Sequence, residues 1–209
     1  MASERSHIGT SLQFDDVVTR SLEALYQTKD AARRRDGVLD ALQLQSGERV
    51  LDIGTGPGFL AAEMAEAVGP GGQIHCIDMS EPMLDMARKR CAGKPWVVFQ
   101  PGAATDLPVG DATFDVAISV QVYEYITDVT RALFEMYRVL RPGGRAAIVS
   151  TDWDAIAWHA SDSARMNRVL GAFAEHCAHT ALPRTLASKL RQAGFILKEP
   201  RVIPQFNPM

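Results

Sequence analysis

The sequence predicts an α/β protein with a doubly wound, mostly parallel sheet and helices on both faces. Short apolar stretches of strand length alternate with longer stretches of helical periodicity along the 209 residues. The first strand-like stretch, Arg49–Gly54, is largely apolar, which is typical of a strand buried on both sides. A loop with three glycines follows directly, and a helical stretch follows the loop.

Helical spacing of apolar residues predicts two helices before the first strand, Asp15–Gln27 and Ala31–Leu44. The second contains three consecutive arginines, residues 33–35. These arginines either form a solvated helix face or include one that reaches the carboxylate of a cofactor.

Strands alternate with helices through the rest of the chain. The predicted strands are Arg49–Gly54, Gln73–Met79, Trp96–Gln100, Phe114–Val120 and Arg145–Ser150. The predicted helices are Phe59–Val68, a helix capped by Ser80, Thr127–Leu140, Asp162–Cys177 and Pro183–Ala193. The glycines and proline of residues 141–144 are expected to end the Thr127–Leu140 helix.

A sixth strand is expected to begin within Phe195–Ile203, although little chain remains to pair beside it. An unpaired sheet edge is an aggregation hazard. The hypothesis is therefore that a last strand is missing, because the natural protein continues past Met209 or because residues are absent.

The totals fit one globular domain without a dominant charge. The formal net charge is −3 and no long basic run occurs, which disfavours nucleic acid as the main partner. Cys76, Cys91 and Cys177 are far apart and match no zinc-ligand spacing, so a reduced, intracellular setting is favoured. The N-terminus lacks the apolar core of a signal peptide, and no apolar run approaches the length of a membrane span. We expect a cytoplasmic protein.

The stretch Val50–Gly58, VLDIGTGPG, is the expected centre of a ligand site. Glycine lets the backbone approach a ligand closely, and the helix behind it presents unpaired N–H groups and a partial positive charge. A dinucleotide-binding loop has the pattern G-x-G-x-x-G, whereas this loop is G-x-G-x-G and Asp52 precedes it. The Asp52 carboxylate would repel a pyrophosphate, so a nicotinamide-dependent dehydrogenase is the weaker alternative. Asp52 suits a ligand with a positively charged amino group, or it braces the loop by accepting backbone N–H bonds.

Asp78 ends the second predicted strand, 20 residues after Gly58. Its carboxylate either caps the next helix or accepts hydrogen bonds from both hydroxyls of a ribose. The glycine loop upstream favours the ribose.

Several segments, taken in order, resemble the class I S-adenosylmethionine-dependent methyltransferases, in particular small-molecule enzymes of the type 11 kind. They are VLDIGTGPG, the acid that closes the second strand, GAATDLP, FDVAISVQVYEYITD and VLRPGGRAAIV, and they span about residues 48–151. The resemblance implies a Rossmann-like methyltransferase fold and S-adenosyl-L-methionine as the cofactor. We expect a single domain, 1–209, with an N-terminal helical cap (1–44), a cofactor-binding core (48–151) and a C-terminal substrate-side segment (152–209).

The resemblance also implies roles for individual residues. The residues expected against the methionine part are Asp52, Gly54, Gly56, Gly58, Val120 and Gln121. Asp78 would hold the ribose, and Met79 would lie against the adenine unless it packs in the core. Many members have Asp where this chain has Ala103, so backbone groups of Ala103 and Ala104 are expected to hold the adenine instead.

The methyl acceptor is expected to be a small molecule, because TDWDAIAWHASD looks like a segment found in small-molecule methyltransferases. An acceptor hydroxyl or carbon acid needs a base, and His159 in the loop after the fifth strand is the first candidate. Alternatively, Trp153 and Trp158 pack under the C-terminal helices and His159 only forms a hydrogen bond. The weaker candidates are Tyr123, Glu124 and Asp152.

Two further expectations concern what the protein holds. No metal is expected, because no His/Asp cluster has ligand spacing. A protein that binds S-adenosylmethionine without catalysis remains an alternative to the enzyme. The sequence carries no indication of the oligomeric state.

Overall fold

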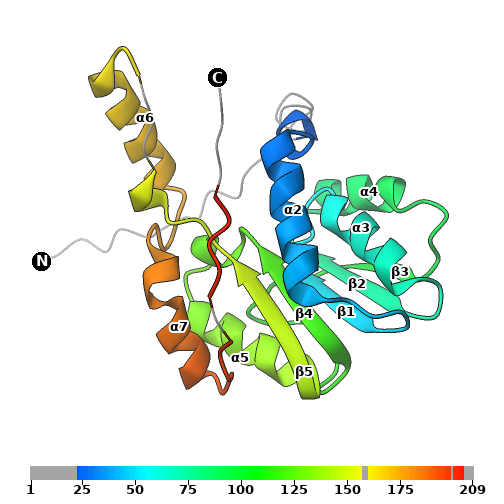
Figure 1. Ribbon diagram of the computed structural model, residues 1–209. Coiled ribbons are helices and arrows are strands. Elements are labelled where there is room, and N and C mark those ends of the chain that lie inside the picture. The colour runs from blue at the N-terminus through cyan, green and yellow to red at the C-terminus, as the bar shows by residue number, and fades with distance from the viewer. Residues whose placement is uncertain (1–22, 157–159, 199, 205–209) are drawn as a thin grey trace, which may run out of the picture.

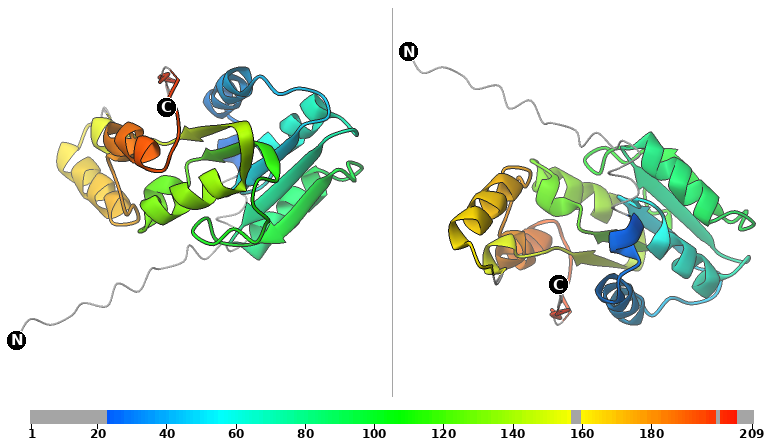
Figure 2. Two further views of the ribbon diagram at one scale, coloured as in Figure 1. Left: turned by 90° about the horizontal axis from the view of Figure 1, so that it is seen from below. Right: turned by 90° about the horizontal axis from the view of Figure 1, so that it is seen from above.

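The computed structural model describes residues 23–156, 160–198 and 200–204. Five parallel strands form one sheet in the order β3-β2-β1-β4-β5. They are β1 (Arg49–Ile53), β2 (Gln73–Asp78), β3 (Val97–Pro101), β4 (Phe114–Val120) and β5 (Leu140–Val149). Helices cover both faces of this sheet (Figure 1, Figure 2). The predicted doubly wound α/β fold is confirmed.

The helices form two layers with the sheet between them. One layer contains α2 (Lys29–Leu42), α3 (Phe59–Val68) and α4 (Glu81–Arg90), and the other contains α5 (Val129–Val139) and α7 (Leu182–Gln192). The remaining helix, α6 (Ser163–Ala174), extends away from the sheet (Figure 1). Two short 3₁₀ turns, Tyr123–Tyr125 and Trp153–Ala155, follow β4 and β5.

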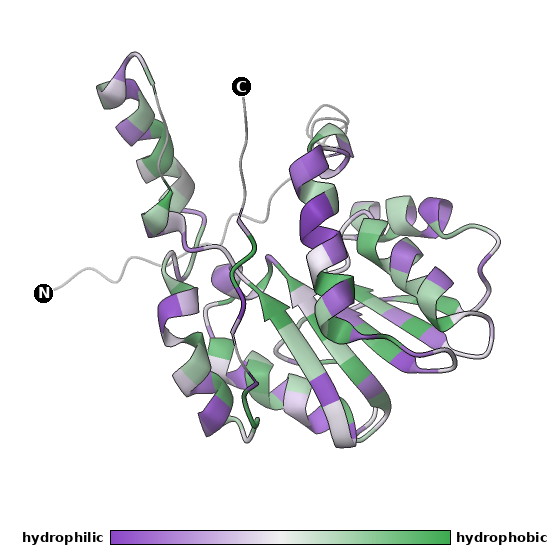
Figure 3. Ribbon diagram, in the orientation of Figure 1, coloured by the Kyte–Doolittle hydropathy of each residue, from purple (hydrophilic) through white to green (hydrophobic). Residues whose placement is uncertain are grey.

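The sheet is buried on both faces because its strands are apolar on both sides. Along β1, Val50 packs in the cluster under α2 and α3, whereas Leu51 and Ile53 pack in the cluster under α5. Figure 3 shows hydrophobic residues along most of the sheet's central strands. Burial on both faces leaves only the ends of the strands open to a ligand.

Local signals fix the helix ends. The α2 helix begins at Lys29, before the predicted Ala31, because the Thr28 hydroxyl accepts a hydrogen bond from the Ala31 N–H at 3.3 Å. Ser80 caps α4 as predicted, with its hydroxyl accepting from the Met83 N–H at 3.4 Å. Of the predicted Asp15–Gln27 helix, residues 23–26 are helical, Gln27 is a turn, and residues 15–22 lie outside the described residues.

The stretch after α5 differs from its prediction. Residues 141–144 were expected to form a turn before a strand that starts at Arg145, but β5 already begins at Leu140. Leu140 pairs with Phe114 and Arg145 pairs with Val116, so β5 has an irregularity that takes up the extra residues. The α5 helix ends at Val139, one residue earlier than predicted.

The predicted sixth strand is wrong within the described residues. Residues 195–198 and 200–203 form no strand. Contacts with α2 account for this difference: Arg201 forms an ion pair with Asp40 at 3.6 Å, and Ile203 packs beside Gly37. Since no described strand pairs with its outer side, β5 is an edge of the sheet.

Candidate functional site

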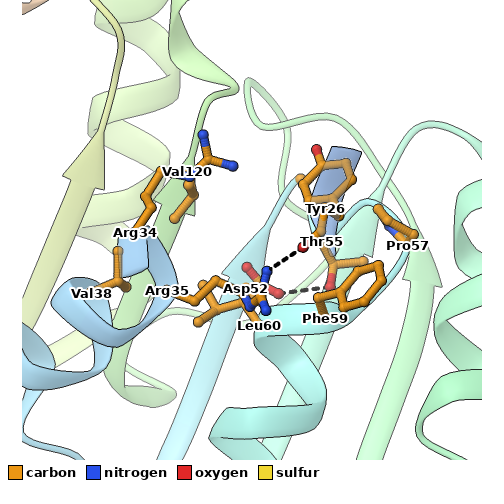
Figure 4. Close-up of a pocket in the computed structure, with 11 residues that line it drawn as sticks. Tyr26, Arg34, Arg35, Val38, Asp52, Thr55, Pro57, Phe59, Leu60 and Val120 are labelled. Atoms are coloured by element: carbon orange, nitrogen blue, oxygen red, sulfur yellow. Dashed lines mark hydrogen bonds between the residues drawn. The ribbon is translucent and has the colours of Figure 1, made fainter. Parts of the chain in front are cut away.

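A pocket lies at the carboxyl ends of β1 and β4, between α2 and the glycine loop (Figure 4). Ligands of open parallel sheets bind at this kind of position, where neighbouring strands lead to helices on opposite faces. Here α3 after β1 and α5 after β4 cover opposite faces. The lining residues with chemical interest are Tyr26, Arg34, Asp52, Gly54, Thr55 and Val120.

Asp78 ties the glycine loop to the next strand end. Its two carboxylate oxygens accept hydrogen bonds from the backbone N–H groups of Gly56 at 2.8 Å and Ser80 at 2.9 Å. The cap of α4 is Ser80, so Asp78 is not the capping acid of that helix. A carboxylate has about four acceptor positions, and Asp78 is only partly buried, which leaves acceptor capacity for a ligand.

Asp52 is buried in the floor of the pocket, with an exposed fraction of 3%. Its bracing partner is a side chain, since the Thr55 hydroxyl donates to Asp52 Oδ2 at 2.7 Å. Desolvation raises the pKa of Asp52 to about 7, and the bond from Thr55 opposes part of that rise. A cationic group brought into the pocket by a ligand would favour the charged carboxylate again.

The three glycines of the loop differ in what an added Cβ would meet. A Cβ on Gly54 would lie 2.2 Å from Val122 Cγ2, and one on Gly58 would lie 2.7 Å from the Ala87 backbone. Packing of the chain itself therefore requires glycine at these two positions. Gly56 has a positive φ of 54°, and a Cβ there would meet nothing nearer than the Tyr26 hydroxyl at 4.0 Å. Of the three, only Gly56 combines a left-handed backbone with open space.

Residues expected near the adenine lie beside Asp78. Met79 is 80% exposed, so the alternative that it packs in the core is wrong. The Ala103 carbonyl accepts a hydrogen bond from the Asp106 N–H at 3.1 Å, and Ala104 is buried. Their expected contacts with adenine stay predictions.

A chain of polar contacts joins α2 to the ends of β4 and β5. Arg34 Nη1 donates to Gln121 Oε1, and Gln121 Nε2 donates to Thr151 Oγ1 at 2.8 Å. Gln121 follows β4 with a positive φ of 55°, and Val120 before it lines the pocket. The structure thus brings both predicted residues of this segment, Val120 and Gln121, to the pocket side of the sheet.

The candidate bases differ in where they lie and in what they contact. Tyr123 is fully buried and donates its hydroxyl to the Ala132 carbonyl at 3.1 Å, which places it in the core rather than at the site. Burial also raises its pKa well above the usual range for tyrosine. Asp152 accepts two hydrogen bonds from Arg184, and this pairing lowers its pKa. Predictions for Trp158 and His159 fall outside the described residues.

Glu124 is also fully buried, next to the site. Its oxygens accept from Ser150 Oγ at 3.1 Å and from the Thr151 N–H at 3.4 Å. Burial raises its pKa despite these bonds. The bonds place Glu124 as a support for the segment after β5.

Sequence reasoning missed several pocket residues, among them Tyr26 and Thr55. Tyr26 is distant in sequence from the glycine loop, and its ring stacks on Phe59 at the start of α3 with ring centroids 5.8 Å apart. No sequence pattern pointed to that contact. Thr55 lies inside the loop, three residues after Asp52, and its hydroxyl was a detectable partner for a buried acid.

The described residues lack two features that would indicate other partners. None of their helices has the length and apolar character needed to span a membrane. No three of their His, Cys, Asp and Glu side chains gather in a way that could hold a metal ion.

Comparison with known proteins adds to this geometry. Residues 51–148 match the family described as "Methyltransferase domain". An uncharacterized 37.1 kDa protein in transposon Tn4556 of Streptomyces fradiae is 36% identical over 199 residues, covering 91% of this chain and 56% of that protein. The demethylmenaquinone methyltransferase of Symbiobacterium thermophilum is 34% identical over 137 residues, covering 62% and 54%. The chain thus spans about half the length of these curated relatives.

Solved structures show the same fold. A S-adenosylmethionine-dependent methyltransferase from Aquifex aeolicus aligns with a TM-score of 0.68 at 21% identity, over 90% of this chain and 92% of that chain. The chain has the fold of the class I S-adenosylmethionine-dependent methyltransferases. Its residues 51–148 match the methyltransferase domain, and S-adenosyl-L-methionine is the cofactor of this class.

Proposed function

We propose that this protein transfers the methyl group of S-adenosyl-L-methionine to a small-molecule acceptor. The single observation that carries the proposal is the hydrogen bond between the glycine loop and the acid that ends β2. There the Asp78 carboxylate, bonded to the Gly56 N–H, lies next to an exposed methionine at the mouth of a loop that needs glycine.

The residues present fit this cofactor. Asp78 retains acceptor capacity for the two ribose hydroxyls, and Met79 offers an apolar side chain beside it for the adenine. Asp52 supplies a carboxyl group in the pocket for the amino group of the methionine part. Gly56 leaves the backbone open toward the ligand. Each of these groups lies in the last residues of a strand or just after it, at the carboxyl ends that form the ligand side of such sheets.

The cofactor would supply a methyl group on a sulfonium, which a nucleophile can attack in line at the methyl carbon while the sulfur leaves as a neutral thioether. The chain's own task is to orient the two reactants and exclude water. The segment after β5 is the proposed acceptor side. The bond from Gln121 to Thr151 supports this, because it places the start of that segment beside the pocket residues that follow β4.

The acceptor class is supported by the relatives. The Symbiobacterium protein is named as a demethylmenaquinone methyltransferase, and one from Geobacter sulfurreducens is named as a ubiquinone/menaquinone biosynthesis C-methyltransferase. We therefore propose a small acceptor, and phenols and quinols are the first compounds to test. The division into a cap (1–44), a cofactor core (48–151) and a substrate-side segment (152–209) is part of this proposal. So are a cytoplasmic location and the absence of nucleic acid as a substrate.

Calorimetry followed by a turnover assay tests the function. The protein is titrated with S-adenosylhomocysteine, the demethylated product, and then incubated with S-adenosylmethionine and a panel of phenols, quinols and amines. We expect saturable binding and acceptor-dependent release of S-adenosylhomocysteine. Binding without turnover on any acceptor would favour a non-catalytic cofactor-binding protein. A failure to bind either compound would remove the proposal altogether.

A further inference from the structure

Only one of the three consecutive arginines of α2 is available to a ligand. Arg33 is 68% exposed and pairs with Asp30 on the same helix at 3.5 Å. Arg35 is engaged twice, by Glu63 at 2.8 Å and by the Tyr26 carbonyl at 2.8 Å. Arg34 lies between them in sequence but faces the pocket, where its guanidinium extends from α2 toward the end of β4 (Figure 4).

Arg34 is a buried cation without a bound carboxylate. It is 9% exposed, its Nη1 donates to the neutral amide of Gln121, and its Nε is buried with no hydrogen-bond partner among the described residues. The Glu124 carboxylate is near enough to interact electrostatically, but it accepts hydrogen bonds from Ser150 and Thr151. A buried charge of this kind is costly unless it is paired, so the site is complementary to an anion.

The same pocket also contains a buried acid, which is complementary to a cation. Asp52 contributes a buried carboxyl group, which accepts a hydrogen bond from the Thr55 hydroxyl. The pocket therefore has an acid from β1 and an arginine from α2 among its lining residues. A ligand that bears both an ammonium and a carboxylate matches this pair, and the α-amino acid group is the simplest such ligand.

We propose that Arg34 is the residue that binds the α-carboxylate of the cofactor's methionine part and so selects ligands that carry an intact amino acid end. Gln121 positions the guanidinium, because its own side chain is fixed by Thr151. The carboxylate then bonds to the Nε that has no partner and to a remaining Nη donor, in the forked geometry that arginine favours. This inference rests on the proposed function and adds a specificity determinant to it.

The test compares ligands that differ only at the amino acid end. The probes are S-adenosylhomocysteine, its decarboxylated analogue, which keeps the amine, and 5′-methylthioadenosine, which lacks the whole amino acid end. Calorimetry measures their affinities for the unaltered protein and for Arg34→Gln, Arg34→Lys and Arg33→Gln. Arg33→Gln is the matched control, since it removes a neighbouring arginine that is exposed and outside the pocket.

We expect Arg34→Gln to weaken S-adenosylhomocysteine by about 10- to 100-fold, the range for hydrogen bonds to a charged group. The same variant should leave the decarboxylated analogue and 5′-methylthioadenosine within about twofold, and Arg33→Gln should change none of the three affinities. Arg34→Lys should be intermediate, because it keeps the charge and loses the fork.

Two results would overturn the inference. One is an equal loss of affinity for all three probes, which would indicate that Arg34 only ties α2 to β4. The other is unchanged binding of S-adenosylhomocysteine by Arg34→Gln. If Arg34→Gln does not fold, the ratio of the affinities for the three probes is compared between Arg34→Lys and the unaltered protein. An unchanged ratio would then overturn the inference. Absence of binding by the unaltered protein would instead reject the proposed function on which the inference rests.

Discussion

The Asp78 carboxylate accepts a hydrogen bond from the Gly56 N–H at 2.8 Å, so the acid that ends β2 fixes the loop that follows β1. With the proposed ribose contact, Asp78 would have two tasks, holding the loop and binding a ligand. Replacing it should affect both.

Asp78→Ala should weaken S-adenosylhomocysteine by about 1–3 kcal/mol, since the bonds to a charged acceptor are lost. It should also lower the melting temperature of the ligand-free protein, because the N–H groups of Gly56 and Ser80 lose their acceptor. Calorimetry and thermal unfolding measure the two effects. Asp85→Ala is the control, an acid on the outer side of α4. Unchanged affinity in Asp78→Ala would show that the ribose assignment is wrong.

Met79→Ala should separate ligand binding from stability. Because the side chain is 80% exposed, its removal should leave the melting temperature unchanged. The affinity for S-adenosylhomocysteine should fall by several-fold, about the value of a partly buried apolar contact. Val202→Ala, another highly exposed apolar residue, is the control. Equal affinities for the Met79→Ala variant and the unaltered protein would remove Met79 from the adenine site.

Asp52 should make stability depend on pH. Its pKa is about 7 in the folded protein against 3.8 as the ordinary value, so the folded state retains a proton that the unfolded state releases. The free energy of unfolding should therefore fall as pH rises from about 4 to about 7, by at most about 1.4 kcal/mol per pH unit, and level off above that.

Urea unfolding at several pH values checks this, with Asp52→Asn as the reference. The asparagine keeps an oxygen acceptor for Thr55 but does not titrate, and other buried acids such as Glu124 contribute equally to both proteins. The difference between the two curves isolates Asp52. Parallel curves would contradict the raised pKa.

Gly54→Ala should destabilise the fold by about 1–3 kcal/mol, the usual cost of overpacking. The added Cβ would lie 2.2 Å from Val122 Cγ2, at a positive φ of 74°. Val122→Ala removes both Val122 methyl groups and should recover part of the loss in the double variant. Denaturant unfolding of the two single variants and the double variant gives the coupling. Additive effects would show that the clash is relieved elsewhere.

Asp152→Asn should leave turnover unchanged once an acceptor is known. Its carboxylate is held by Arg184 through bonds of 2.8 and 3.0 Å, and this pairing keeps it deprotonated and directed toward α7. The pH profile of turnover should also be the same in the variant. A loss of the acidic limb in that profile, the limb that reports deprotonation of a base, would return Asp152 to the candidate bases.

The sequence predicted the part of the fold that depends on local patterns. The bounds of α3 and β4 agree with the predictions because a glycine loop and an apolar run mark them. The prediction of a sixth strand was wrong because Phe195–Ile203 has the apolar content of a strand, while Arg201 and Ile203 contact α2, about 160 residues earlier in the chain. Periodicity contains no information about such a contact.

The site shows the same division. The positions of Asp52, Asp78 and Gly56 were predictable because each occupies a fixed place relative to a strand end, whereas their contacts with a cofactor stay predictions. Tyr123 was misplaced because a tyrosine after a strand end can turn to either side, and here its hydroxyl finds the Ala132 carbonyl in the core. Which arginine of residues 33–35 faces the pocket depends on how α2 is rotated on the sheet, and that follows from packing of Val38 and Leu42 in the core.

Because β5 is an edge of the sheet, amide hydrogen exchange along it reports whether another strand pairs with its open side. Since neighbouring residues of a parallel strand bond to opposite sides, alternate amides of residues 145–149 are directed to β4 and the others outward. Amide hydrogen exchange along this strand should therefore alternate between slow and fast. Any strand that pairs with the open side, from this chain or another, would make the pattern uniformly slow.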